Sequence, residues 1–256
     1  MSVLSLRRDP FRLLFSRAPW ASAWYVLAYL FTGPALFAVT LAAVLTAGAL
    51  SITLAGLPLL VVAAAVVQGC ATAERWRLQD VSAEAVSGGY RPVTRPGLLA
   101  RLATQWKDPA IWRDLAYLVA LFVPLMVLNT VALALWLVLL AGITLPAWYH
   151  YPTQTWTIGV SGRGVSSAHG VQLGYFPHGP HGSGAWGLYV DTLPKAIITA
   201  AACLVAFLLF NYVLIAVARL HAAIARALLG APQDPLREAK EVLARPGPLA
   251  DAPRQI

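Results

Sequence analysis

The chain has 256 residues, of which 59% are hydrophobic and only 12% are charged, and its formal net charge is +8. A soluble domain carries about 25% charged residues, so this composition argues against an ordinary soluble protein and predicts that lipid covers much of the surface. The basic balance does not call for a nucleic-acid partner, because nucleic-acid binding needs a basic, soluble element that fits a groove.

The first apolar tract is too long for a single membrane crossing. No Asp, Glu, Lys, Arg or His occurs from Ala18 to Ala73, a tract of 56 residues. One straight helix of that length would measure about 84 Å, whereas the hydrocarbon layer is about 30 Å thick and takes roughly 20 residues to cross. The small and polar residues 46–51 predict a bend, which gives two spans at about 24–46 and 51–72.

Two further apolar runs, Leu115–Leu145 and Ala196–Ala218, predict spans at about 115–140 and 195–218. Backbone groups in lipid must be satisfied within the protein, and the alternating pattern of a barrel is missing, so we expect helices. The predicted fold is an all-α integral membrane protein with four transmembrane helices, arranged as two pairs.

The segment between the third and fourth spans, residues 146–192, is rich in glycine and aromatic residues. Two strand-like pieces within it, 155–158 and 186–190, are expected either to pair as a small hairpin or to lie as a cap over the helices. Asp191–Pro194 then predicts a helix start, because Asp or Thr caps free amides and Pro is tolerated in the first turn. We expect the last helix to continue through 219–229 as far as Gly230.

The distribution of basic residues predicts the orientation. Of the 19 Lys and Arg residues, four precede the first span, seven lie between the second and third, six follow the fourth, and only Arg163 and Lys195 lie between the third and fourth. Basic residues in short loops stay cytoplasmic. We therefore expect a multi-pass protein of the bacterial cytoplasmic membrane with both termini in the cytoplasm, built as one four-span domain at 1–230 and a cytoplasmic tail at 231–256, with 146–192 outside.

The motif WxxxAYL occurs twice, at Trp24–Leu30 and Trp112–Leu118, each time where a span begins. Trp and Tyr favour the headgroup zone, so each copy is expected to mark the depth at which a helix enters the lipid. The order of lead-in, span, connection and span is repeated too, which predicts an internal duplication of a two-helix unit. The lead-in at 96–107 is amphipathic and is expected to lie along anionic headgroups or, alternatively, to dock a partner helix.

Residue types that bind metals or haem are scarce. Cys70 and Cys203 lie in predicted spans and are interpreted as small apolar fillers rather than as a disulfide. His221 is expected at the edge of the fourth span, so no haem is expected between the helices. Four histidines of the outer loop are either metal ligands or, as we favour because acidic partners that would orient the imidazoles are scarce, loop residues without a special role: His150, His169, His178 and His181.

No catalytic site is predicted. The spans hold no acidic pair, and neither a GxSxG turn nor a GxxxxGK[ST] phosphate loop occurs. Asn129, Asn211 and Gln68 are polar residues within the spans and are expected to form interhelical hydrogen bonds. No ionisable residue is expected at depth, which argues against active transport by this chain alone. We therefore expect no enzyme, no catalytic, cofactor-binding or metal-binding residues, and no cofactor.

Five segments together resemble a known family: 56–60 (GLPLL), 74–78 (ERWRL), 108–118 (DPAIWRDLAYL), 191–194 (DTLP) and 218–230, which begins ARL and ends ALLG. Their order and spacing are similar to those of the bacterial putative sensor domain family, a four-span membrane module often fused to two-component histidine kinases. The resemblance implies a four-helix membrane fold and a sensing role, and it implies no catalytic residue. A kinase portion would need roughly 150 residues or more, whereas 26 follow Gly230, so we expect any signal to pass to a separate protein.

Two functions remain open. The first is a non-catalytic membrane sensor or regulatory protein that relays an envelope or ligand signal to a separate cytoplasmic partner, such as a histidine kinase. The second is an integral accessory subunit of a transporter or membrane enzyme complex, because four spans without buried ionisable residues suit packing against larger helices. The lipid bilayer is an expected partner in both, and a homo-oligomer is left open.

Overall fold

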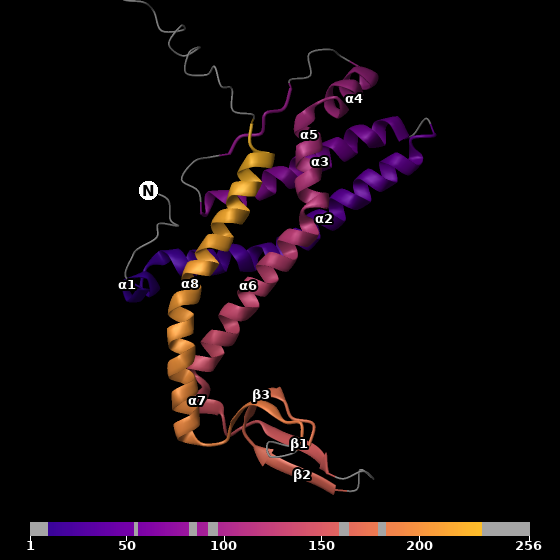
Figure 1. The fold of residues 1–256 in the computed structure, drawn as a ribbon. Coiled ribbons are helices and arrows are strands. Elements are labelled where there is room, and N and C mark those ends of the chain that lie inside the picture. The colour runs from indigo at the N-terminus through magenta and orange to yellow at the C-terminus, as the bar shows by residue number, and fades with distance from the viewer. Residues whose placement is uncertain are drawn as a thin grey trace, which may run out of the picture. The chain divides into compact units, whose positions relative to one another are not determined.

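The computed structural model describes residues 10–53, 56–81, 86–91, 97–158, 164–178 and 183–231. Its helices are α1 (Pro10–Leu14), α2 (Arg17–Leu50), α3 (Gly56–Gln79), α4 (Leu98–Trp106), α5 (Pro109–Leu115), α6 (Phe122–Ile143), α7 (Leu145–Trp148) and α8 (Leu193–Leu229). A π-helical turn, η1 (Ala116–Ala120), joins α5 to α6. Four strands lie between α7 and α8 (Figure 1): β1 (Thr153–Ile158), β2 (Gly164–His169), β3 (Val171–Tyr175) and β4 (Trp186–Val190).

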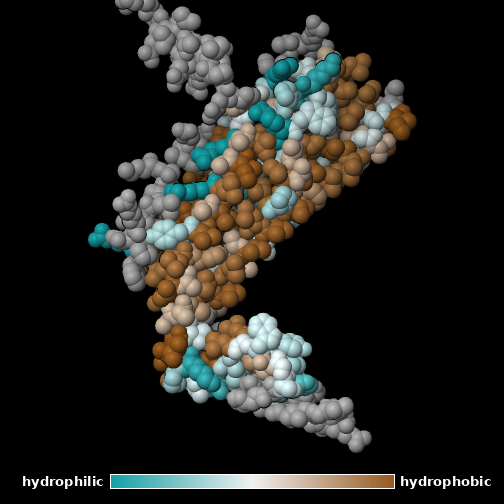
Figure 2. Space-filling model, in the orientation of Figure 1, coloured by the Kyte–Doolittle hydropathy of each residue, from teal (hydrophilic) through white to brown (hydrophobic). Residues whose placement is uncertain are grey.

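Four of these helices, α2, α3, α6 and α8, are long and apolar enough to cross a membrane. Apolar side chains cover most of the face of these helices that Figure 2 shows, and Ile198 on α8, for example, is 70% exposed. Contiguous apolar surface on this scale needs a lipid environment, because water disfavours it. The chain is therefore a multi-pass membrane protein with helical spans, as predicted.

The helices run beyond the predicted spans. α2 continues to Leu50, so the chain turns later than the predicted bend at 46–51. α3 ends at Gln79 rather than near residue 72. The predicted continuation of the last helix to Gly230 is confirmed, since α8 extends over 37 residues to Leu229. Hydropathy marks the length that lipid covers, whereas a helix ends where its backbone hydrogen bonds end.

The π-helical turn η1 stands directly before a proline. Pro124 has no N–H, and its ring excludes the carbonyl group four residues earlier, so the regular α-helical pattern is interrupted at Ala120. The chain passes this point through a wider turn, and the α-helical pattern resumes with the bond from the Leu125 N–H to the Leu121 carbonyl at 3.0 Å. The turn places Tyr117, which is 1% exposed, in the interior.

The chain forms two compact units. The first is built on residues 121–223 with the first part of α2. The second is built on α3, α4, α5 and the end of α8. Both α2 and α8 contribute residues to the two units.

Within the first unit, α6 and α8 pack antiparallel, as three successive contacts show. Asn129 of α6 lies beside His221 of α8, the Trp136 indole N–H donates to Asn211 Oδ1 at 3.1 Å, and Gly142 faces Cys203. The predicted interhelical hydrogen bonds of Asn129 and Asn211 are confirmed. Asn129 and Asn211 also donate to the carbonyl four residues earlier in their own helices, at 2.7 Å each.

The strands form two separate antiparallel hairpins, β1 with β2 and β3 with β4. The strand-like pieces 155–158 and 186–190 lie within β1 and β4, but the expected pairing of the two with each other is wrong. Each pairs instead with its neighbour in the sequence, because a short connection costs less entropy to close than a long one. Leu145, Val190 and Ala196 form a small buried core where this region meets α7 and α8.

Candidate functional site

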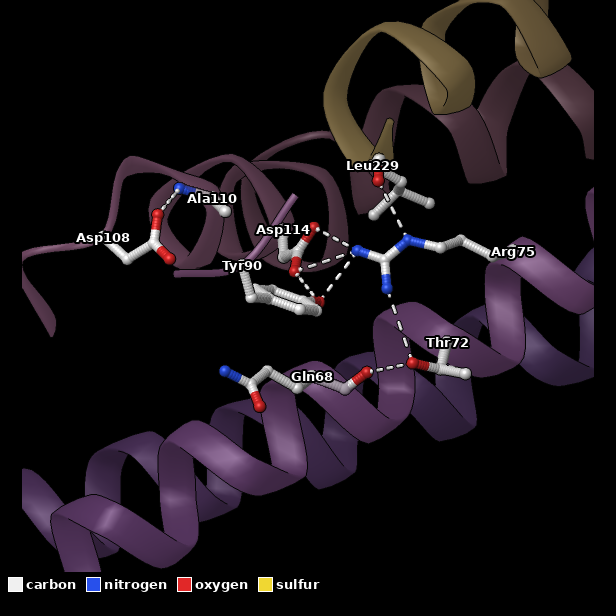
Figure 3. A network of polar contacts seen from close by, with 8 residues as sticks. All are labelled: Gln68, Thr72, Arg75, Tyr90, Asp108, Ala110, Asp114 and Leu229. Atoms are coloured by element: carbon white, nitrogen blue, oxygen red, sulfur yellow. Dashed lines mark hydrogen bonds and ion pairs between the residues drawn. The ribbon is translucent and has the colours of Figure 1, made fainter. Parts of the chain in front are cut away.

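The charged segment Glu74–Arg77 lies in the last turns of α3, and three of its side chains are buried. Glu74, Arg75 and Arg77 are 1%, 5% and 8% exposed, whereas Trp76 between them points outward. Removing a charge from water is costly unless it is paired and hydrogen-bonded. Glu74 and Arg77 pair with each other, whereas the partners of Arg75 come from distant parts of the second unit. We call Arg75, Tyr90, Asp114 and Leu229 together the arginine network (Figure 3).

The first partners of Arg75 are an aspartate and a tyrosine. Its Nη2 donates to Asp114 Oδ1 at 3.1 Å, to Asp114 Oδ2 at 3.3 Å and to the Tyr90 hydroxyl at 2.8 Å. The Tyr90 hydroxyl donates to Asp114 Oδ2 at 2.5 Å, and the guanidinium carbon lies 5.1 Å from the centre of the Tyr90 ring. The network therefore combines an ion pair, a shared phenol and a cation–π contact.

A glycine makes room for this arrangement. A Cβ at Gly88 would lie 2.7 Å from the Tyr90 ring and 3.0 Å from the Arg75 guanidinium carbon. Real Cβ atoms do not approach that closely, so only glycine fits between the two side chains. The segment 86–91 can therefore run directly beside α3.

Arg75 also binds the end of the last membrane helix. Its Nε donates to the carbonyl of Leu229, the final residue of α8, at 2.9 Å. The last carbonyls of a helix have no partner within it and carry partial negative charge, so a guanidinium is well suited to cap them. Two residues later, the Ala231 N–H donates to the Ser87 carbonyl at 3.0 Å, which fixes the same helix end to segment 86–91.

Asp108 holds the other end of segment 86–91. Its Oδ1 accepts from the Ala110 N–H at 3.0 Å, as expected of a residue that caps α5 before a proline, and its Oδ2 accepts from the Arg91 N–H at 2.8 Å. α5 therefore binds the segment at two adjacent points, through Asp108 and through Asp114.

A second ion pair lies beside the arginine network. Arg77 donates to Glu74 Oε2 through Nη2 at 2.8 Å and Nε at 3.0 Å, and the Tyr117 hydroxyl lies 3.4 Å from the same oxygen. Among the residues that the structure describes, the other carboxylate oxygen, Glu74 Oε1, is buried without a hydrogen-bond partner. Tyr117 is thus positioned against α3 by the widened turn η1.

The electrostatics of the network keep its phenol protonated. Burial raises the pKa of Tyr90 to about 12, and the hydrogen bond to Asp114 adds to this effect. Burial also raises the pKa of the Asp114 carboxyl, while the Tyr90 hydrogen bond and the Arg75 charge act in the opposite direction. Asp114 and Arg75 are almost sealed from solvent, which suits a contact that holds elements together better than one that attacks a substrate.

The first unit contains a buried ionisable residue on α8. His221, expected at the edge of a span, is fully buried, and its Nδ1 lies 2.8 Å from Asn129 Nδ2. The rings of Tyr25 and Tyr29 lie edge-on to the imidazole, with centroids 5.3 and 4.5 Å away. His221 lies three residues beyond the predicted span at 195–218, in the predicted continuation of the last helix, and it is covered there by α6 and the first part of α2.

The outer histidines are placed as follows. His150, His169 and His178 are exposed, and His169 Nδ1 lies 3.4 Å from the Thr153 hydroxyl, whereas His181 lies outside the described residues. Within the described ranges, no group of three or more His, Cys, Asp or Glu side chains is arranged to hold a metal ion. Cys70 and Cys203 are both free thiols. Their predicted role as unpaired fillers is confirmed.

The sequence singled out two segments of the arginine network but did not predict that they are in contact. Segments 74–78 and 108–118 stood out as motifs. The missing signal was the pairing of Arg75 with Asp114, 39 residues apart, which is a tertiary contact. One signal could have indicated this contact: Glu74, Arg75 and Arg77 directly follow the uncharged tract. If the helix continues through these residues, their charges need partners.

Comparison with known proteins identifies a family. A family model described as "Putative sensor" matches residues 25–229. No curated protein and no solved structure matches the chain. The matched range includes every residue of the arginine network and the buried His221.

Proposed function

Since the chain belongs to the family described as "Putative sensor", we propose that it is a non-catalytic membrane sensor that relays a signal to a separate cytoplasmic partner. The input is taken up in the region of β1 to β4, and the output is given where α8 ends in the arginine network. The excess of basic residues outside the 146–192 loop supports a cytoplasmic position for that network.

The observation that carries this proposal is the contact of Arg75 with the Leu229 carbonyl. α8 follows β4 after two residues and continues without interruption to Leu229. A helix of 37 residues is about 55 Å long, more than the roughly 30 Å of hydrocarbon that a span must cross. A displacement of its first turn is therefore passed along one hydrogen-bonded rod to the residue that Arg75 holds.

The network favours two discrete states over gradual change. Removing one partner from a buried ion pair costs about 3–5 kcal/mol, so partial separation of Arg75 from Asp114 is unfavourable. In one state Arg75 binds Asp114, Tyr90 and Leu229 together. In the other, α8 is released and Ser87 and Ala231, which are exposed and joined by one backbone hydrogen bond, separate to form a changed surface for the partner.

The test is a comparison of transcription in the native host with and without envelope stress. The wild-type strain is compared with a deletion strain and with strains carrying Arg75→Gln or, as a matched control, Arg101→Gln at an exposed position of α4. We expect the stress-dependent difference to be lost in the deletion strain and in Arg75→Gln, and kept in Arg101→Gln, at equal membrane levels of each protein. An unchanged response in the deletion strain would contradict the proposal.

Purification in mild detergent distinguishes the alternative of an accessory subunit. A sensor is expected to copurify with a signalling protein whose retention differs between wild type and Arg75→Gln. A permease in fixed stoichiometry, retained equally by both, would contradict the sensor and favour the accessory role.

A further inference from the structure

The β3–β4 hairpin carries an apolar ladder on one face. Antiparallel residues directly opposite each other share a face, and the register pairs Val171 with Val190, Leu173 with Leu188 and Tyr175 with Trp186. The first pair belongs to the buried core with Leu145 and Ala196. Toward the tip the ladder opens: Leu173 and Leu188 are 50% and 43% exposed, and Tyr175 and Trp186 are 59% and 69% exposed.

The other face of the hairpin is built differently. It carries Gln172 paired with Tyr189 and Gly174 paired with Gly187. Both glycines have a positive φ, 141° and 130°, and a Cβ on either would collide with the backbone of the opposite strand. The two strands are therefore in close contact, and the outward apolar side chains all belong to the same face.

The exposed ladder continues a surface that faces lipid. Only two residues separate β4 from α8, whose exposed apolar residues begin at once with Leu193, 49% exposed, and Ile197, 53% exposed. The hairpin projects sideways from the ends of α7 and α8 (Figure 1). Its described residues, 171–178 and 183–190, include no Asp, Glu, Lys or Arg. A protein interface or an ionic ligand would normally be matched by charged or polar groups at its rim, which this face does not offer.

We propose that the apolar ladder of Leu173, Leu188, Tyr175 and Trp186 lies on the lipid surface at the β-strand end of α6 and α8. The order of side chains matches the membrane interface, because tyrosine and tryptophan favour the headgroup zone and leucine the acyl boundary. If the chain is a sensor, as proposed above, the lipid leaflet that the ladder contacts is what it senses. A change in that leaflet would then move β4 and, through the two residues between them, α8.

The test measures what surrounds single side chains of the full chain in vesicles of phosphatidylcholine and phosphatidylglycerol. In a background of Cys70→Ala and Cys203→Ala, spin labels are placed at Leu173→Cys or Leu188→Cys, and at Tyr151→Cys as a control that is 73% exposed outside the hairpin. Oxygen concentrates in lipid, whereas a nickel chelate stays in water, and both speed the relaxation of a nearby spin label. The ratio of the oxygen effect to the nickel effect is therefore high for a label in lipid and low for a label in water. We expect this ratio to be several-fold higher at both ladder positions than at Tyr151.

Three outcomes are distinguishable. A high oxygen ratio at both ladder positions supports the inference. Ratios equal to that of Tyr151 overturn it, because the ladder then faces water. Protection from both reagents also overturns it, in favour of a protein contact or a second copy of the chain. If the ladder does not face lipid but Arg75→Gln still abolishes the transcriptional response, the proposed sensor function is supported and the lipid contact is refuted. If the ladder faces lipid but Arg75→Gln leaves the transcriptional response unchanged, the lipid contact is supported and the proposed relay through Arg75 is refuted.

Discussion

A guanidinium buried as deeply as that of Arg75 is stable only while its partners stay in place. Asp114 supplies the opposite charge. The Tyr90 hydroxyl accepts from Arg75 Nη2 and donates to Asp114, and the Leu229 carbonyl accepts from Arg75 Nε. Each partner comes from a different segment, so the loss of any one leaves the others unsatisfied. The cost of an unpaired buried charge, and not the net strength of the pair, makes the network sensitive.

Removing the carboxylate of Asp114 tests this sensitivity. We expect Asp114→Ala to lower the stability of the folded protein by about 3 kcal/mol or more, because it leaves Arg75 buried without its charge partner. The matched control is Lys195→Ala, which breaks the exposed ion pair with Asp191 and should cost under about 1 kcal/mol. Denaturant unfolding in detergent measures both. Equal effects of the two substitutions would show that burial of the Arg75 pair is not what matters.

The pH dependence of stability reports on the same carboxyl. Burial raises the pKa of Asp114 above the ordinary value of about 3.9. At a pH between the ordinary pKa and the raised pKa, the Asp114 carboxyl is ionised in the unfolded chain but still protonated in the folded protein. The free energy of unfolding therefore falls as the pH rises through this window. We expect the thermal midpoint of the wild type in detergent to show this fall, and Asp114→Asn, which does not titrate there, to lack it. Parallel curves for the two proteins would refute the assignment.

At the scale of elements, the four long helices and the end of α8 were predictable, whereas the ends of α2 and α3 were not. Uncharged tracts can cross lipid only as helices, so all four long helices follow from composition and length. The continuation of α3 to Gln79 adds the charged residues Glu74, Arg75 and Arg77, and hydropathy assigns such residues to loops. They stay helical because tertiary partners satisfy their side chains, as Asp114 does for Arg75 in the last turns of α3.

The strands were harder to pair than to find. Aromatic and β-branched residues indicated β1 and β4, because these residues fit an extended backbone. Their partners give a weaker signal, because β2 (GVSSAH) contains a glycine and two serines and β3 (VQLGY) contains a glycine. Pairing of the strands depends on short connections and, in β3–β4, on close backbone contact at Gly174 and Gly187. Those are properties of three-dimensional contact that single-residue preferences do not express.

The packing of α6 against α8 depends on one small residue. A Cβ at Gly142 would lie 2.5 Å from Cys203 Sγ, whereas a Cβ at Gly69 in α3 would meet no atom within 4 Å. We expect Gly142→Leu to destabilise the protein by about 1–3 kcal/mol through overpacking, and Gly69→Leu to have a smaller effect. Thermal unfolding in detergent compares the two. Adding Cys203→Ala should recover part of the loss at Gly142, and no recovery would argue against this contact as its cause.

At the scale of the whole molecule, the two WxxxAYL motifs show a related arrangement in each unit. Tyr29 of the first copy is buried against His221, and Tyr117 of the second copy lies 3.4 Å from Glu74. Each tyrosine thus contacts an ionisable side chain on the second long helix of the other half of the sequence. An internal duplication predicts such reciprocity, and the duplication itself stays a prediction. The motif was noticed for its position at the membrane surface, whereas its tyrosines are interior residues.

The account as a whole depends on the β-strand region and the arginine network lying on opposite sides of the membrane. Ser183, beside β4, and Ser87, beside Arg75, are both exposed and can each be replaced by cysteine without disturbing a buried side chain. A membrane-impermeant maleimide applied to intact cells is predicted to label Ser183→Cys, and to label Ser87→Cys only after the membrane is permeabilised. Labelling of Ser87→Cys in intact cells would place the network outside and contradict the relay.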